Sequence, residues 1–276
     1  MQPFLKWAGG KRQLLPFLRR YTPQSYRSYY EPFIGAGAML LDLAPSKAIV
    51  NDANSELINC YQVIKEQPVR LLEELAKHEN TKEHFYSVRE WDRQSNYGRL
   101  GAVKKAARII YLNKTCYNGL FRVNQKGHFN VPFGKYKNPR MADAESIKAL
   151  SAYFNDNDVT FINGDFEAAA KTAGKGDFVY FDPPYDPLNE TSSFTSYHQN
   201  HFGKDAQKRL FKLYDKLAKK GCHVMLSNSS TDFIKDLYKD YHILTIPATR
   251  SINSVASKRG KVNEFLILNY APGEGL

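Results

Sequence analysis

The residues best suited to chemistry are Asp182-Pro183-Pro184-Tyr185, which directly follow the apolar run at 178–181. An amino group on an aromatic ring, such as that of adenine, is a weak nucleophile because its lone pair is delocalised into the ring. The Asp182 carboxylate and the Pro183 carbonyl can accept its two hydrogens. The prolines stiffen this turn and remove N–H donors, and Tyr185 can stack on the base. The alternative interpretation is an ordinary polar turn, because Asp and Pro are common turn residues.

A glycine-containing turn follows a short apolar strand at 29–33. Phe33 ends this strand, and Gly35 and Gly37 stand between it and an apolar helical stretch, where glycines let the backbone approach a ligand closely. The next expected strand, 47–51, ends at Asp52, and an acid in that place accepts hydrogen bonds from ribose hydroxyls. Only two glycines are present, so the full dinucleotide fingerprint is absent. The pattern favours a ribose-bearing cofactor other than a nicotinamide.

Two further segments carry ligand-binding residue types. The N-terminal stretch includes Trp7, paired glycines and Lys11, which suggests a backbone wrapped closely around a ligand, although a disordered basic leader is the alternative. Asp165 and Phe166 follow the expected strand 159–162, where the acid can bind an adenine amine and the ring its face. Ligands of open α/β sheets bind outside the carboxyl ends of the strands, so we expect all these motifs to meet at one rim.

The charge distribution favours a polyanionic partner. The formal net charge is +11, and the segment 99–142 contains no Asp or Glu. Basic and aromatic residues alternate there, as phosphate contact and base stacking require. They are Arg99, Lys104, Lys105, Arg108, Lys114, Arg122, Lys126, Lys135, Lys137 and Arg140, with Tyr111, Tyr117, Phe121, Phe129, Phe133 and Tyr136. A solvated basic face is the usual alternative. A membrane surface is disfavoured, since no long amphipathic apolar face accompanies the charge.

The cysteine pattern and the hydropathy limit the classes further. Cys60, Cys116 and Cys222 lie far apart and form no Cys-x-x-Cys pair, so we expect no metal site and no redox motif. None of them follows a proline, which argues against a covalent cysteine–base intermediate. No apolar stretch approaches about 18 residues, so we expect a cytoplasmic protein without membrane contact.

The coarse pattern is α/β. Helices are expected at 11–20, 37–43, 205–219 and 231–239, and strands at 47–51, 159–162, 178–181, 223–227, 242–246 and 265–269. Between 55 and 112 the pattern is mainly helical. Two short runs, 121–124 and 129–131, surround a glycine-containing turn and predict a β-hairpin. We therefore expect a catalytic domain at 1–56 and 145–276, interrupted by a recognition domain at 57–144.

Taken together, the motifs resemble the Dam-type DNA adenine N6-methyltransferases of the alpha class, over nearly the whole chain. The match includes Lys6-Trp7-x-Gly9-Gly10-Lys11, Glu31-Pro32-Phe33-x-Gly35-x-Gly37, Asn51-Asp52, Gly164-Asp165-Phe166 and Asp182-Pro183-Pro184-Tyr185. Its most specific parts are Tyr117-Asn118-Gly119-Leu120-x-Arg122-x-Asn124 and Phe129-Asn130-Val131-Pro132-Phe133-Gly134-x-Tyr136-Lys137. It looks closest to the restriction–modification branch that acts on GATC.

The resemblance implies a Rossmann-like S-adenosylmethionine-dependent methyltransferase fold with an inserted, mainly helical recognition domain and a β-hairpin. It implies direct in-line methyl transfer to an adenine flipped out of duplex DNA, by a monomer or weak dimer and without a metal. Trp7, Lys11, Phe33, Gly35, Gly37, Asp52, Asp165 and Phe166 would bind the cofactor, and Asp182, Pro183, Pro184 and Tyr185 would hold the target adenine.

For DNA, the resemblance implies that Arg122 and Asn124 read base edges. Leu120 and Pro132 would contact a thymine methyl group, Tyr117 would wedge into the base stack, and Asn118 would fill the space that this opens. Lys6 and Tyr136 would contact the first guanine, and Lys137 a phosphate. Segments 194–198 and 250–261 are a candidate lid and a candidate phosphate-binding loop.

Two rival functions remain open from the sequence. The Asp-Pro-Pro-Tyr pattern also suits transferases acting on cytosine N4, RNA adenine or a glutamine amide, although the basic segment favours DNA. A DNA-binding protein that retains the cofactor but has lost catalysis is the other, and the intact Asp52, Gly35 and Asp182 argue against it.

Overall fold

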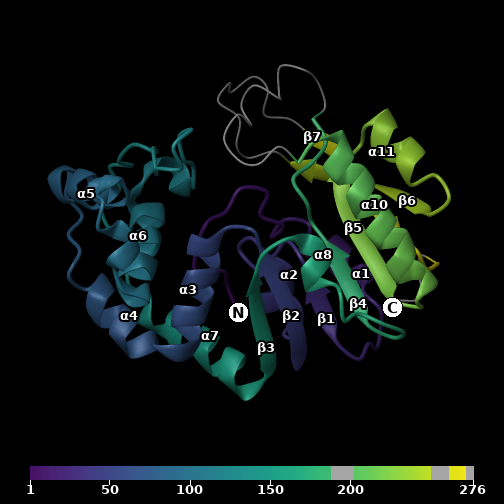
Figure 1. Ribbon diagram of the computed structural model, residues 1–276, viewed down its shortest axis with the longest axis horizontal. Helices are drawn as coiled ribbons and strands as arrows, with labels where there is room; N and C mark the ends of the chain where they lie inside the picture. Colours follow the sequence, from purple (N-terminus) through teal and green to yellow (C-terminus); the bar gives the residue numbers. More distant parts are fainter. Residues whose placement is uncertain (188–201, 250–260, 272–276) are drawn as a thin grey trace. The chain divides into compact units, whose positions relative to one another are not determined.

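The computed structural model describes residues 1–187, 202–249 and 261–271 (Figure 1). Its sheet has the strand order β3-β2-β1-β4-β5-β7-β6. The strands are β1 (Tyr29–Glu31), β2 (Lys47–Asp52), β3 (Asp158–Asn163), β4 (Phe178–Phe181), β5 (His223–Ser229), β6 (His242–Thr249) and β7 (Lys261–Leu268). Strand β1 is parallel to β2 and β4, and β4 is parallel to β5, whereas β7 runs antiparallel to both β5 and β6.

This order differs from the dinucleotide-binding order 3-2-1-4-5-6 by one antiparallel strand, which lies between the fifth and sixth strands. It confirms the predicted Rossmann-like α/β class and is that of the S-adenosylmethionine-dependent methyltransferase fold. The four residues of β4 are all buried. Such a continuous apolar run is typical of a central parallel strand that is covered on both faces.

The described chain forms two compact units, each discontinuous in sequence. The first contains 1–10, 35–46 and 52–164, and the second contains 11–34, 47–51 and the described residues from 165 onward. The predicted recognition domain, 57–144, lies wholly inside the first unit, and the predicted catalytic domain contributes residues to both. The domain boundaries that we expected from the sequence therefore stay a prediction.

The first unit is mainly helical, as expected. Its helices are α2 (Ala38–Leu43), α3 (Ser55–Glu66), α4 (Pro68–Leu75), α5 (Lys82–Arg89), α6 (Ala102–Thr115) and α7 (Ala144–Asp156), with short 3₁₀ turns η1 (Glu90–Arg93), η2 (Tyr97–Arg99) and η3 (Tyr117–Gly119). Asn54, Thr81 and Asp143 cap α3, α5 and α7 with side-chain oxygens. Figure 1 shows α3 beside α6, and α6 buries most of its second half.

The second unit contains α1 (Leu15–Arg20), α8 (Phe166–Ala169), α10 (Lys204–Lys219) and α11 (Asp232–Leu237). On α10, Leu210, Tyr214 and Leu217 recur at helical spacing and are buried in a core cluster with β4 and β5 residues such as Phe181 and Leu226. Figure 1 shows α10 lying along β5. This packing holds the carboxyl end of β4, where the Asp-Pro-Pro-Tyr motif begins.

Several element boundaries differ from expectation. The first helix begins at Leu15 rather than at position 11, since Pro16 favours the first turn of a helix. Strand β1 ends at Glu31, because Pro32 has no N–H to donate. The candidate lid, 194–198, and residues 250–260 of the candidate phosphate loop lie outside the described residues, whereas Lys261 begins β7.

The predicted hairpin is present as a minimal antiparallel pair. A bridge joins Val123 to Phe129, and the flanking bonds run from Asn124 N to His128 O at 2.8 Å and from Asn130 N to Arg122 O at 3.0 Å. This register sets Arg122 directly opposite Asn130.

Candidate active site and nucleic-acid interface

Asp182 follows β4 directly and faces a single described cation. Lys11 Nζ lies 2.9 Å from Asp182 Oδ1, and the two side chains are only 7% and 18% exposed. Burial raises the pKa of Asp182, while the neighbouring Lys11 ammonium opposes that rise. The sequence placed Lys11 with the cofactor-binding residues, but in this structure its ammonium occupies an acceptor that we assigned to the target amine.

Tyr185 lies in the same cluster. Its phenol donates a hydrogen bond of 2.7 Å to Glu264 Oε2 on β7, and Lys11 Nζ lies 4.6 Å from the centre of its ring. Burial, together with the charges of Asp182 and Glu264, raises the pKa of Tyr185 well above the usual tyrosine value. The ring is therefore neutral and held at its hydroxyl end, which leaves it suited to stacking.

Buried polar side chains hold the Asp-Pro-Pro-Tyr loop by hydrogen bonds to its backbone. Gln207 Nε2 on α10 donates to the Pro184 carbonyl at 3.0 Å, and Gln207 itself accepts from Asn228. The next residue, Asp186, receives a bond from Thr231 and donates its N–H to Asn228 Oδ1 at 3.1 Å. Gln207 and Asn228 have no exposed surface. A fully bonded buried network of this kind fixes one backbone conformation.

The second unit also brings together residues that we predicted for the adenine of a cofactor. The rings of Phe33 and Phe166 stack with centroids 5.3 Å apart. Asp165 has a local structural role, because its Oδ1 caps α8 through Glu167 N at 3.0 Å and pairs with Arg209 at 3.1 Å. Arg209 lies over the Phe166 ring at 5.1 Å. Phe166 is only 5% exposed and belongs to the buried core cluster, whereas Phe33 is half-buried, so Phe33 carries the more accessible of the two rings.

In the first unit, the glycine turn and Asp52 form one structure. Asp52 Oδ2 accepts from Gly35 N at 3.1 Å, and Oδ1 accepts from Asn54 N at 2.9 Å. Gly35 has φ +49°, and a Cβ there would lie 3.1 Å from Trp7 Cδ1. Gly37 likewise has a positive φ, 70°, at the start of α2. The glycines are therefore required by the backbone itself.

Trp7 links this turn to the hairpin within the first unit. Its ring stacks on Phe121 with centroids 4.8 Å apart and an interplanar angle of 22°. The backbone of Lys6 is held on both sides by Asn113, through bonds of 3.0 and 2.9 Å. Lys6 Nζ lies 5.9 Å from the Tyr136 ring, so these two predicted guanine contacts are neighbours.

The hairpin side chains are arranged by one another. Arg122 Nε donates to Asn130 Oδ1 at 2.7 Å, and its Nη2 donates to Asn130 O at 3.3 Å. Asn124 Oδ1 accepts from Lys126 N and His128 N, which gives that oxygen a role inside the turn. Arg122 is exposed, and Asn124 is half-buried.

The remaining predicted DNA contacts lie near the surface of this unit. Tyr117 is 55% exposed, unusual for a large aromatic residue, and Asn118 adopts a left-handed conformation with φ 57°. Pro132 and Lys137 are exposed, whereas Leu120 is half-buried. Asn80 donates to the Tyr136 carbonyl at 2.7 Å and so holds the segment that carries Lys137.

Some residues of the basic segment belong to the interior. Arg108 is only 2% exposed and pairs with Asp92 at 2.7 Å, so it is not a phosphate contact. Asp92 in turn accepts from Phe129 N at 2.7 Å, which ties the hairpin to η1. Tyr111 is fully buried and stacks on His78. The continuous basic segment of the sequence therefore contains both exposed cations and a buried arginine, Arg108, that stabilises the interior of the unit.

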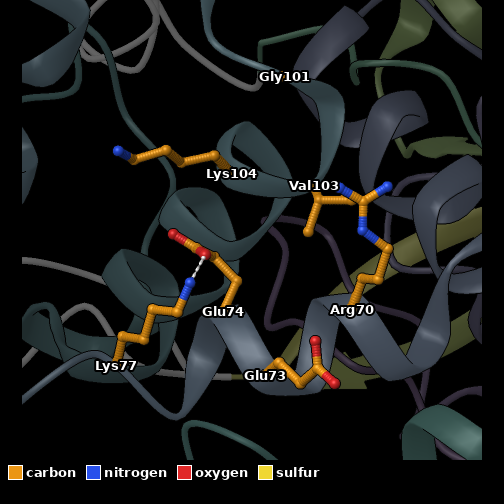
Figure 2. Close-up of a pocket in the computed structure, with 7 residues that line it drawn as sticks. All are labelled: Arg70, Glu73, Glu74, Lys77, Gly101, Val103 and Lys104. Atoms are coloured by element: carbon orange, nitrogen blue, oxygen red, sulfur yellow. Dashed lines mark hydrogen bonds and ion pairs between the residues drawn. The ribbon is translucent and has the colours of Figure 1, made fainter.

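Two hollows of about 260 Å³ each lie in the first unit. One, formed by α4, α6 and adjoining residues, has charged side chains of both signs and includes the Glu74–Lys77 ion pair of 2.6 Å; Figure 2 shows its lining of Arg70, Glu73, Glu74, Lys77, Gly101, Val103 and Lys104. None of these is a predicted site residue. The other lies at the hairpin and includes Phe121, Val123, Lys126 and Arg108.

Glu264, Gln207 and Asn130 are candidate functional residues that sequence reasoning did not single out for a site. Glu264 and Gln207 contact the motif loop from 79 and 23 positions away. Neither stands in a recognisable motif, so no local signal pointed to them. Within the described ranges, no cluster of three or more His, Cys, Asp or Glu residues is arranged for a metal ion. In the same ranges, no helix is both long and apolar enough to cross a membrane.

The strand order and the motif at the end of β4 define the methyltransferase class of α/β proteins. Residues 7–252 match the model of the D12 class N6 adenine-specific DNA methyltransferases. The chain is 49% identical over 272 residues to the Type II methyltransferase M1.LlaDCHI of Lactococcus lactis subsp. cremoris, covering 98% of this chain and 96% of that protein. It is 44% identical over 290 residues to the Type II methyltransferase M.MjaIII of Methanocaldococcus jannaschii, covering 98% and 99%.

A third relative is the DNA adenine methylase of Escherichia coli K12, which is 37% identical over 278 residues, covering 98% of this chain and 95% of the relative. The chain belongs to the D12 class of N6 adenine-specific DNA methyltransferases. It is therefore an enzyme that acts on DNA, and the predicted family is confirmed.

Proposed function

We propose that the enzyme transfers a methyl group from S-adenosylmethionine to adenine N6 within GATC sites of double-stranded DNA, acting as a monomer on an adenine flipped out of the helix. The observation that carries the catalytic part is the Asp182–Lys11–Tyr185 cluster on a braced loop. Two of the relatives are named as Type II methyltransferases, which favours a restriction–modification role.

The residues of each unit fit S-adenosylmethionine. In the second unit, the Phe33–Phe166 ring pair and the Asp165 carboxylate suit an adenine and its amine. In the first, Asp52 presents a carboxylate beside the glycine turn for ribose hydroxyls, and Trp7 closes against Gly35. When bound, the cofactor would supply an activated methyl carbon for direct transfer to N6, and the methylated amine would release one proton to solvent.

The protein's own groups prepare the target amine. An ionised Asp182 and the Pro183 carbonyl accept its hydrogens, while Tyr185 stacks on the base. The ammonium of Lys11 takes one of the acceptor positions of Asp182, and the carboxylate keeps others for the target amine. Flipping the adenine costs a few kcal/mol, which stacking on Tyr185 offsets in part.

For recognition, we propose that Arg122 reads a guanine through the edge of its guanidinium that Asn130 leaves accessible. Asn130 accepts from Nε at 2.7 Å and from Nη2 at 3.3 Å, so the Nη1 side of the guanidinium is the edge that we propose for the base. Leu120 and Pro132 contact a thymine methyl, Asn124 reads an adenine edge through its amide nitrogen, and Lys6 with Tyr136 contacts the first guanine. Tyr117 wedges into the stack, Asn118 fills the vacated space, and Lys137 binds phosphate.

The test is transfer of labelled methyl to two duplexes, one with GATC and one with its adenine already N6-methylated on both strands. Incorporation only into the first supports the base, the atom and the site. Equal incorporation into both rejects the proposed target. Incorporation only into RNA supports RNA adenine as the substrate. Incorporation into a duplex that has cytosine but no adenine supports cytosine N4.

The catalytic assignment is tested separately. Asp182→Ala and the isosteric Asp182→Asn should lower transfer by about 100-fold or more, while cofactor binding stays measurable. Asp205→Asn is the matched control, since that carboxylate is 99% exposed on α10. Turnover retained in both Asp182 variants rejects the role.

A further inference from the structure

Glu264 connects the antiparallel strand β7 to the catalytic cluster. Its carboxylate accepts the Tyr185 phenol at 2.7 Å. Its backbone is fixed on both sides, because Glu264 lies opposite Ser229 of β5 and opposite Ile246 of β6. The acceptor for Tyr185 is therefore held by a paired strand in the sheet, where its position is defined.

The same strand neighbour also supports the motif loop. Ser229 Oγ donates to the Asp186 carbonyl at 2.6 Å, and Tyr185 lies one residue before this contact. Glu264 thus holds the hydroxyl of the Tyr185 ring, and Lys11 Nζ lies 4.6 Å from the centre of that ring, over one face. Strand β5 holds the backbone at the next residue, Asp186. The plane of the Tyr185 ring is set before any base arrives.

We propose that Glu264 is a positioning residue of the methyl-transfer site, which orients the Tyr185 ring for stacking and acts through its charge on Asp182. The inference rests on the proposed roles of Tyr185 and Asp182. The role of Glu264 differs from the roles of Tyr185 and Asp182, because Glu264 would contact neither the target base nor the cofactor.

The charge effect has a defined direction. The groups that act electrostatically on Asp182 are Lys11 from the N-terminal segment, Glu264 from β7, Tyr185 from its own loop and Tyr180 from β4. Among these, the negative charge of Glu264 raises the pKa of Asp182, and Lys11 lowers it. Neutralising Glu264 should therefore make Asp182 ionise at lower pH.

The experiment compares Glu264→Gln and Glu264→Leu by single-turnover methyl transfer across a pH range, with KM for the DNA measured for each. Gln keeps an acceptor but removes the charge. We expect it to retain the rate within about threefold at neutral pH and to move the acid limb of the pH profile to lower pH. Leu removes the acceptor, and we expect a loss of about 10- to 100-fold in rate, with KM little changed.

Tyr185→Phe separates positioning from a general structural role. If Glu264 acts through the phenol, Glu264→Leu has little further effect in the Tyr185→Phe background. An undiminished loss in that background overturns the proposal, as does a folded Glu264→Leu enzyme with the parent rate. If Glu264→Leu fails to fold, the acid limb of Glu264→Gln decides, and an unmoved limb overturns it. Failure of the Asp182 assignment is distinguishable, since it appears as turnover retained in both Asp182→Ala and Asp182→Asn.

Discussion

Removing the Lys11 ammonium provides a direct test of the charge balance around Asp182. Two unit charges 2.9 Å apart attract by about 6 kcal/mol at an effective dielectric constant of about 20. Desolvation of both ions offsets part of this. Loss of one partner of a largely buried pair costs about 3–5 kcal/mol. We therefore expect Lys11→Met to lower the free energy of unfolding by about 3 kcal/mol near pH 8.

The pH dependence of that loss follows from the carboxyl group. The folded-state pKa of Asp182 is already raised by burial, and removing Lys11 raises it further. A carboxyl group whose pKa is raised in the folded state contributes its full stability at pH values below its ordinary, unfolded pKa. That stability is lost as the pH rises through the folded-state pKa. The deficit of Lys11→Met should hence shrink as the pH is lowered. The acid limb of methyl transfer should move to higher pH, because Asp182 must be ionised.

Chemical denaturation at several pH values measures the first effect, and single-turnover methyl transfer measures the second. Lys219→Met is the matched control, because its 2.6 Å pair with Asp215 is shorter but exposed, with Lys219 75% exposed. An exposed pair of this kind contributes about 0.5 kcal/mol. A deficit for Lys11→Met that does not change with pH, or that equals the control, refutes the reasoning.

Three further predictions concern the first unit. Arg108→Leu removes the buried partner of the Asp92 carboxylate, which keeps only the less buried Arg93 at 2.9 Å, and should cost about 3 kcal/mol of stability, with faster amide exchange along the hairpin. His78 has a pKa lowered to about 4, chiefly by burial; its contribution to stability should therefore fall as the pH drops from about 6.5 toward about 4, and His78→Phe should remove that contribution in denaturation curves. Gly35→Ala should cost about 1–2 kcal/mol and weaken cofactor binding in calorimetry, because of φ +49° and the Trp7 contact, whereas Gly164→Ala meets nothing within 4 Å and should be close to neutral.

The parts of the site that could be predicted from the sequence are those whose signal lies in residues adjacent along the chain. The strand 178–181 and the motif after it could be recognised together, because a buried parallel strand gives a continuous apolar run. The hairpin turn was predictable because a glycine stands between two short strand-like runs. The structure gives this glycine, Gly127, a φ of 79°, which glycine adopts readily. In both cases one short segment carries the whole signal.

Other features depend on contacts between distant segments. The Glu264–Tyr185 bond spans 79 positions, and its acid looks in the sequence like any exposed strand residue. Arg108 appeared to belong to a basic surface, because charge patterns do not show which cation finds an interior carboxylate. The Lys11–Asp182 pair likewise needed the fold, since the two residues belong to different motifs.

The path of the chain through the two compact units limits how such an enzyme can acquire a new target sequence. The chain passes between the units five times, at 10/11, 34/35, 46/47, 51/52 and 164/165. Four of these passages fall inside Gly10-Lys11, Ile34-Gly35, Asn51-Asp52 and Gly164-Asp165, where the motif residues stand. Neither unit can therefore be exchanged between lineages as one continuous gene segment without cutting those motifs. New specificity is instead expected within 57–144, which includes the hairpin and lies between the passages at 51/52 and 164/165, so that this stretch can change while the motifs stay intact.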